Sequence, residues 1–153
     1  MTGVQTCALP ICEKSQEGLS VTNNEKGRTI ITSRRFEKGE YLCVYGGENI
    51  SFSEYKRRRI IYAEQGLGNY LFEFKTSNGK KAYSDATPET NNFGRLINHS
   101  RKEANCTACL SKIENNYYIY FKSNKVIDCG QELLYDYGDR DAKTLNEFRW
   151  LKE

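Results

Sequence analysis

Short segments rich in β-branched and aromatic residues, separated by turn dipeptides, restrict the fold of this chain more than any other feature of its sequence. Asn78-Gly79 separates residues 70–76 from residues 80–84. Asn-Gly tolerates the positive φ angles of a type I′ turn better than most dipeptides, so this stretch predicts a β-hairpin with a tight turn.

Further strands of the same kind are predicted along the chain. They cover residues 28–33, 41–45, 112–114, 117–122 and 132–135. Asn115-Asn116 predicts a second hairpin like the first, and Lys38-Gly39 predicts a turn between two strands. These segments together predict a mainly β domain with few helices.

One helix is clear in the sequence, beginning after Ser51 and ending near Gly66. Ser51 and Glu54 have the spacing of a capping box, which satisfies backbone N–H groups at a helix start. The aromatic residues of this segment fall near one helical face, as expected for a face that packs on a domain. A second, shorter helix is predicted for residues 143–151.

Composition excludes several classes of protein. A chain of 153 residues with 38% apolar and 28% charged residues fits one soluble globular domain rather than a disordered chain. No apolar run approaches the roughly 20 residues that a membrane span needs, so no membrane partner is expected.

Residues 1–16 match no periodic pattern and are predicted to be a leader outside the domain, such as a tail or a sequencing artefact. The domain itself is predicted at 17–142, with a flanking segment at 143–153.

Charge alone does not identify a partner, because the formal net charge is only +3. The predicted helix carries the basic run Lys56, Arg57, Arg58 and Arg59. Such a run contacts DNA or serves as a localisation signal in some proteins and is a solvated helix face in others. Both interpretations stay open at this point.

The six cysteines do not predict a metal site. Cys106 and Cys109 form one C-x-x-C pair, but no second pair and no His-x-x-x-His follows, whereas a structural zinc site needs four ligands. Residues 1–12 lack the basic start of a secretory signal, so an oxidising compartment is not expected. Reduced, buried thiols are therefore expected, and no metal.

Two segments differ from generic strand or loop. Residues 95–100 contain His99, the single histidine of the chain, and residues 132–139 contain Tyr135 and Tyr137. A lone histidine is usually a structural hydrogen-bonding residue. Tyrosines at i and i+2 of an extended segment lie on one face and more often pack in a sheet than take part in catalysis. Neither segment predicts an enzyme by itself.

Taken in order, Asn98-His99-Ser100 followed by Tyr135-Asp136-Tyr137-Gly138 resembles the signature of SET domains. The resemblance covers nearly all of the chain after residue 17 and is strongest to the branch that monomethylates histone H4 at lysine 20. Further matching stretches are 26–28, 45–47, 69–70, 85–87, 89–91 and 150–152. The resemblance does not include the cysteine-rich, zinc-binding segment that follows the domain in several other branches, so no such segment is expected.

The resemblance implies a fold, an activity and a setting. The fold would consist of small curved β-sheets around a knot-like C-terminal segment. The activity would be transfer of a methyl group from S-adenosylmethionine to a lysine of histone H4, with monomethylation of lysine 20. The partners would be the histone H4 tail in the nucleosome and, through the basic run at 56–59, DNA. We expect a monomer in the nucleus, associated with chromatin.

The resemblance also implies which residues carry the chemistry. Tyr137 would be the main catalytic residue, acting with Tyr45 and Tyr135. A channel for the substrate lysine would be lined by Tyr45, Asn69, Tyr70, Tyr135 and Tyr137. Such a channel desolvates the lysine ammonium and favours loss of its proton. Tyr135 would restrict the product to monomethyl-lysine, because its hydroxyl leaves less room than Phe for an already methylated amine.

Cofactor binding is implied for a further set of residues. These are Lys26, Gly27, Arg28, Tyr70, Arg95, Asn98, His99 and Trp150. Trp150 would pack on the adenine, although ordinary core packing is the alternative. Thr29 departs from the Gly-x-Gly that the family has at this loop, and a β-branched residue does not easily replace a glycine that approaches a ligand or has positive φ.

Three alternatives remain open. Thr29 would fit a SET-like module that binds a partner but has lost catalysis. An active enzyme could instead methylate a non-histone lysine. A nucleic-acid-binding β-protein would explain the aromatic and basic residues, but neither Asn98-His99-Ser100 nor the Tyr135 to Tyr137 segment.

Overall fold

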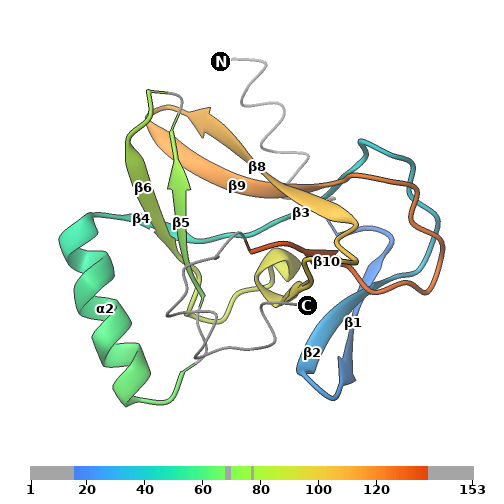
Figure 1. Ribbon diagram of the computed structural model, residues 1–153, viewed down its shortest axis with the longest axis horizontal. Coiled ribbons are helices and arrows are strands. Elements are labelled where there is room, and N and C mark those ends of the chain that lie inside the picture. Colours follow the sequence, from blue (N-terminus) through green and yellow to red (C-terminus); the bar gives the residue numbers. More distant parts are fainter. Residues whose placement is uncertain (1–15, 68–69, 77, 138–153) are drawn as a thin grey trace.

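The computed structural model describes residues 16–67, 70–76 and 78–137 and has four small β-sheets (Figure 1). The strands are β1 (Leu19–Asn24), β2 (Gly27–Thr32), β3 (Tyr41–Val44), β4 (Glu48–Ile50), β5 (Leu71–Lys75), β6 (Lys81–Asp85), β7 (Asn98–His99), β8 (Cys106–Ile113), β9 (Asn116–Ser123) and β10 (Leu134–Tyr135). The helices are α2 (Phe52–Glu64) and the 3-10 helix η1 (Phe93–Leu96). The predicted mainly β class with few helices is confirmed.

Both predicted hairpins form, with turns that differ from the prediction. The β5–β6 ladder ends at the Lys75–Lys81 pair, so its loop is longer than the two-residue turn expected from Asn78-Gly79. The β8–β9 ladder ends at the Ile113–Asn116 pair. Its turn residues are Glu114 and Asn115, with φ angles of 49° and 69°. This is the positive-φ turn that was predicted, shifted by one residue.

Two three-stranded sheets and one additional hairpin form most of the framework. The sheets have the strand orders β3-β9-β8 and β4-β6-β5, and the hairpin consists of β1 and β2. Strand β1 was not predicted because its sequence, LSVTNN, is mostly polar. The core is continuous across these sheets, and its largest fully buried apolar side chains are Ile30, Phe36, Leu42, Ile97, Phe121, Ile127 and Leu133.

The shortest pairing in the fold joins the two sequence motifs. Strands β7 and β10 have two residues each and pair in parallel, with Leu134 opposite Asn98 and Tyr135 opposite His99. On the other side of β10, Asn105 supplies a backbone N–H to the Leu134 carbonyl at 2.9 Å and a side-chain oxygen to the Leu134 N–H at 2.9 Å. Asn105 thus takes the place of a neighbouring strand.

Helix α2 lies at the margin of the domain, beside the β4-β6-β5 sheet (Figure 1). It begins as predicted, because the Ser51 hydroxyl accepts a hydrogen bond from the Glu54 N–H at 3.2 Å. The Tyr55 ring packs on the Tyr83 ring of β6, with centroids 4.5 Å apart. None of the 13 residues of α2, all of which the structure describes, is fully buried. Apolar packing alone therefore does not hold this helix.

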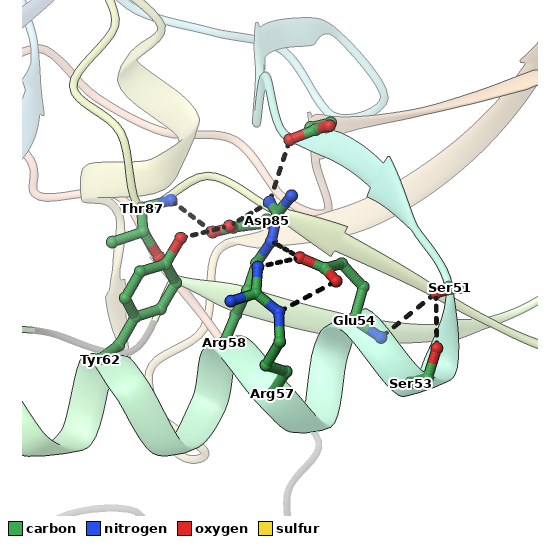
Figure 2. A network of polar contacts seen from close by, with 9 residues as sticks. Ser51, Ser53, Glu54, Arg57, Arg58, Tyr62, Asp85 and Thr87 are labelled. Atoms are coloured by element: carbon green, nitrogen blue, oxygen red, sulfur yellow. Dashed lines mark hydrogen bonds and ion pairs between the residues drawn. The ribbon is translucent and has the colours of Figure 1, made fainter.

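Polar contacts attach α2 to β6 (Figure 2). The Asp85 carboxylate accepts hydrogen bonds from the Arg58 guanidinium at 2.8 Å, the Tyr62 hydroxyl at 2.8 Å and the Thr87 N–H at 2.9 Å. Arg58 also pairs with Glu48 at 3.0 Å. Arg58, one of the four residues predicted to contact DNA, is thus engaged within the domain.

The structure has no helix, among the residues that it describes, that is long and apolar enough to cross a membrane. The predicted helix at 143–151 and residues 1–15 of the predicted leader at 1–16 fall outside those residues. Gln16, which we assigned to the leader, accepts a hydrogen bond from the Phe93 N–H at 2.6 Å.

Candidate active site

The β7–β10 pair brings the histidine motif directly beside the tyrosine motif. The Ser100 N–H donates to the Tyr135 carbonyl at 3.1 Å. The Tyr137 N–H donates to Nδ1 of His99 at 3.0 Å, and the two rings meet edge to face with centroids 4.9 Å apart. The single histidine is therefore a structural residue in one respect, since it fixes the direction in which Tyr137 leaves β10.

An aromatic cluster forms where these strands meet. Tyr135, only 6% exposed, is at its centre, with its ring centroid 4.6 Å from that of Tyr137 and 4.8 Å from that of Phe121. Phe72 stacks on Tyr135 at 6.4 Å and meets Tyr45 edge to face at 5.2 Å. The structure thus brings together the three tyrosines predicted to be catalytic.

Phe72 and Phe121 were not singled out from the sequence, although both fall within predicted strands. A signal for each was present in the alternation of residues along the strand. Phe72 lies between Tyr70 and Phe74 at a spacing of two, and Phe121 follows Ile119 at the same spacing. Side chains at this spacing point to one face of a sheet.

Two of the tyrosine hydroxyls in the cluster donate to backbone carbonyls. The Tyr45 hydroxyl donates to the Tyr70 carbonyl at 2.7 Å, and the Tyr137 hydroxyl donates to the Ile97 carbonyl at 3.0 Å. Burial raises the pKa of Tyr45, of Tyr135 and of Tyr137, and neighbouring phenols raise each pKa further. Tyrosine is uncharged at neutral pH even with its ordinary pKa, and these shifts reinforce that state, so the three phenols form an aromatic surface without an anion.

Tyr70 reaches the same region and is held by Arg95. The Arg95 guanidinium is buried and lies over the Tyr70 ring, 4.1 Å from its centroid. It donates to the carbonyls of Ala86 at 2.6 Å and Thr87 at 3.0 Å and pairs with Glu89. The side chain of Arg95, a predicted cofactor-binding residue, is therefore occupied by contacts within the protein that hold Tyr70 and residues 86–87.

The other predicted cofactor residues of the N-terminal part lie at the β1–β2 turn. The Lys26 N–H donates to the Asn24 side chain at 2.9 Å, and Gly27 has a φ of +101°. Arg28 forms an ion pair at 2.7 Å with Glu89, the residue that also pairs with Arg95. Through Glu89, the turn at 26–28 is thereby linked to Arg95, the residue that lies over the Tyr70 ring.

Two predicted site residues, Asn69 and Trp150, lie outside the described residues. Thr29 lies within β2, opposite Thr22 of β1 in regular antiparallel pairing, and is 1% exposed. Its hydroxyl donates to the Glu132 carboxylate. A β-branched residue is well suited to this strand position, so Thr29 does not distort the backbone as a residue forced into a glycine conformation would.

The cysteine pair of β8 is separated by the geometry of the strand. Cys106 is buried, and its thiol donates to the Leu134 carbonyl at 3.2 Å, whereas Cys109 is partly exposed. Burial raises the pKa of Cys106 to about 12. Within the described part of the chain, no three His, Cys, Asp or Glu side chains gather in a way that could hold a metal ion.

Comparison with known proteins gives consistent matches. Residues 27–138 match the SET domain family. N-lysine methyltransferase KMT5A of Xenopus tropicalis is 43% identical over 129 residues, which cover 83% of this chain and 38% of that protein. Histone-lysine N-methyltransferase Set8 of Drosophila melanogaster is 34% identical over 153 residues, which cover 99% of this chain and 21% of that protein. The crystal structure of CpSET8 from Cryptosporidium has a TM-score of 0.74 at 36% identity and covers 80% of this chain and 58% of that chain.

The chain thus spans 38% of the length of the Xenopus relative. The family match begins at the first residue of β2 and extends beyond Tyr137. It includes every strand of the aromatic cluster and both halves of the β7–β10 pair. The matched stretch covers more than half of the chain and includes the residues that build the site. The chain therefore belongs to the SET domain family.

Proposed function

We propose that this chain is the catalytic domain of a protein-lysine N-methyltransferase that uses S-adenosylmethionine and monomethylates histone H4 at lysine 20. The uncharged aromatic cluster around Tyr45, Tyr135 and Tyr137, adjoining Asn98 and His99, is the observation that carries the proposal. The names of the relatives, N-lysine methyltransferase and histone-lysine N-methyltransferase, support the same reaction class.

The state of the phenols suits a lysine that must lose a proton. A lysine amine has an ordinary pKa near 10.4 and attacks only when neutral. An anion beside it would stabilise the ammonium, whereas an apolar aromatic surface disfavours that charge by desolvation. Because the phenols of Tyr45, Tyr135 and Tyr137 are uncharged, the cluster does not stabilise the ammonium and favours the neutral amine. In the proposed mechanism the Tyr137 hydroxyl orients this amine, and Tyr135 limits the space around it.

The residues near the cluster fit a cationic sulfonium cofactor. When bound, S-adenosylmethionine supplies an electrophilic methyl group. The described residues proposed to hold it are Asn98 and His99 together with the turn at 26–28. Their donor set is chemically suitable, because the Asn98 amide has both a donor and an acceptor and the nearby phenols are uncharged. Tyr70 and Arg95 support this side of the site by their mutual stacking.

A transfer assay tests the proposed function directly. The purified domain is incubated with labelled S-adenosylmethionine and either nucleosomes or an H4 tail peptide, with a peptide carrying arginine in place of the target lysine as control. We expect one methyl group on the target lysine and none on the control. Absence of both transfer and cofactor binding would instead favour a partner-binding module, and transfer to the control peptide would favour another lysine.

The product state provides a second test. Tyr135→Phe removes the hydroxyl from the centre of the cluster while keeping the ring contacts with Phe121 and Tyr137. We expect mass spectrometry to detect dimethyl-lysine with this variant and monomethyl-lysine with the parent. Tyr118→Phe, on the exposed side of β9, is the matched control and should leave the product unchanged. An unaltered product distribution for Tyr135→Phe would contradict the assigned role.

We also propose that α2 contacts nucleosomal DNA through Lys56, Arg57 and Arg59, which places the protein on chromatin in the nucleus. Arg58 is left out because Asp85 binds it. Lys56→Gln combined with Arg59→Gln should reduce activity on nucleosomes more than on the free peptide, because phosphate contacts dominate DNA affinity. An equal reduction on both substrates would count against DNA contact.

A further inference from the structure

One carboxylate connects the β1–β2 hairpin to the histidine motif. Oε2 of Glu132 accepts hydrogen bonds from the Asn24 amide at 3.2 Å, the Thr29 hydroxyl at 2.5 Å and the Asn98 amide at 3.2 Å. The three donors come from β1, β2 and β7, which are separate in sequence. Glu132 was predicted only as the first residue of a strand, and no role in the site was assigned to it.

The backbone around Glu132 is held on two sides. Glu132 forms an antiparallel bridge with Ile31, and the next residue, Leu133, donates its N–H to the Ile30 carbonyl at 2.9 Å. The Glu132 carbonyl accepts from the Asn105 side-chain amide at 2.9 Å. With its main chain fixed in this way, Glu132 needs to order only its side chain to reach Asn98.

The contact determines which atom of Asn98 faces a ligand. An ionised carboxylate only accepts hydrogen bonds, so the NH2 group of the Asn98 amide must face Glu132. The carbonyl oxygen of the same amide is then directed to the opposite side. A flipped amide would place the Asn98 oxygen against the Glu132 carboxylate, so that two acceptors would face each other and the hydrogen bond to Glu132 would be lost. Glu132 therefore presents the Asn98 oxygen as an acceptor.

Thr29 reinforces the position of the carboxylate. Its hydroxyl makes the shortest of the three contacts with Glu132 and is buried, whereas Asn24 is exposed. A glycine at position 29, which the family pattern would favour, has no hydroxyl to donate. Thr29 thus adds an anchor for Glu132 that a glycine cannot provide.

We propose that Glu132 and Thr29 are positioning residues for cofactor binding, which hold the Asn98 amide so that its carbonyl oxygen accepts a hydrogen bond from S-adenosylmethionine. This inference rests on the proposed function. It reverses the interpretation of Thr29 as a sign of lost activity, because the residue contributes to the organisation of the cofactor side of the site.

The test measures binding of S-adenosylhomocysteine by calorimetry, together with the melting temperature and the steady-state constants. Glu132→Met removes the acceptor and should raise Kd about 10-fold, the effect of losing one hydrogen bond to a charged group. Glu132→Gln keeps an acceptor oxygen and should recover part of the affinity. For both variants the KM for cofactor should rise more than the KM for peptide, because Asn98 is proposed to contact the cofactor.

Variants of Thr29 separate the hydroxyl from the side-chain volume. Thr29→Ser keeps the hydroxyl and should bind cofactor like the parent, whereas Thr29→Val keeps the shape and should bind about 3- to 10-fold more weakly. Thr32→Val is the matched control, since Thr32 is equally buried in β2 but donates to the Asp128 carbonyl at 2.6 Å. It should lower the melting temperature without raising Kd.

The outcomes distinguish this inference from the proposed function. A parent domain that neither binds S-adenosylhomocysteine nor transfers a methyl group would refute the proposed function itself. A parent domain that binds, with unchanged Kd for Glu132→Met and Thr29→Val, would overturn the positioning role alone. A rise in Kd for Thr32→Val equal to that for Thr29→Val would also overturn it, because the effect would then follow packing. If Glu132→Met does not fold, the Kd values of Thr29→Ser, Thr29→Val and Thr32→Val still test the positioning role.

Discussion

Removing the guanidinium of Arg58 should destabilise the domain far more than removing that of its neighbour Arg57. Asp85, whose side chain is 0% exposed, accepts one charge-assisted hydrogen bond from Arg58 and one each from the Tyr62 hydroxyl and the Thr87 N–H. Breaking a buried ion pair costs about 3–5 kcal/mol when nothing else compensates the charge. Since two donors to Asp85 remain, we expect Arg58→Met to cost about 2–3 kcal/mol.

Arg57→Met is the matched control, because the Arg57 side chain is 60% exposed and pairs with Glu54 at the surface. A pair of this kind contributes no more than about 1 kcal/mol. Urea unfolding followed by circular dichroism measures the difference. With a slope of about 2 kcal/mol per M, Arg58→Met should lower the midpoint by about 1–1.5 M and Arg57→Met by less than about 0.5 M. Equal midpoints for the two variants would refute the reasoning.

The loss of unfolding free energy in Arg58→Met should depend on pH. Burial by itself would raise the pKa of Asp85, but hydrogen bonds from Thr87, Arg58 and Tyr62 outweigh it and lower the pKa below the ordinary value. A lowered carboxyl pKa stabilises the folded state above about pH 3.9, and that stabilisation is lost as the pH falls through the folded-state pKa. Glu54, whose pKa the hydrogen bonds from Arg57 and Arg58 lower to about 2, titrates in the same acidic range.

The advantage of the parent over Arg58→Met should therefore be full near neutral pH and should shrink below about pH 4. Unfolding free energies measured at several acidic pH values provide the check. A difference that stays constant down to about pH 2 would show that Arg58 stabilises the domain by packing rather than by pairing with Asp85.

Three further predictions concern the core and the site. Phe121→Ala should lower the free energy of unfolding by about 3–5 kcal/mol in urea titrations, because Phe121 is 0% exposed; a loss below about 1 kcal/mol would contradict its place in the core. Tyr45→Phe should cost about 1 kcal/mol, since it removes the bond to the Tyr70 carbonyl, and an unchanged urea midpoint would count against that bond. Iodoacetamide should alkylate Cys129, which is exposed, but not Cys106, which is buried and has a pKa raised to about 12. Mass spectrometry of the treated, folded protein is the check, and modification of both residues would contradict the burial of Cys106.

Local sequence signals predicted the elements that depend on neighbouring residues. The cap at Ser51 and the hairpin between β8 and β9 follow from residues within a few positions of each other, and both form. Strand β8 is longer than the predicted segment 112–114, because its first half, CTAC, consists of small residues with a weak strand signal of their own and is paired with β9. Tertiary pairing thus extended an element that local propensity only began.

The site depended on information that is not local. The β7–β10 pair joins residues about 36 positions apart through strands of two residues, and no local pattern predicts such a pairing. Only the motif resemblance assigned both His99 and Tyr137 to the site, and the structure brings them into contact. Glu132 was missed because its importance lies in three donors from other segments, which the sequence around it does not indicate.

A pairing as short as β7–β10 leaves the site intolerant to changes in length on either side of it. Insertion or deletion of one residue within β10 would turn Tyr135 to the opposite face, and the same change within β7 would turn His99, because side chains alternate along a strand. Loop residues between the strands are under no such restriction, provided that Asn105 still reaches Leu134. Engineering of this domain should therefore place inserted sequence in the exposed turn at 101–103, where added residues do not change the register of the β7–β10 pairing.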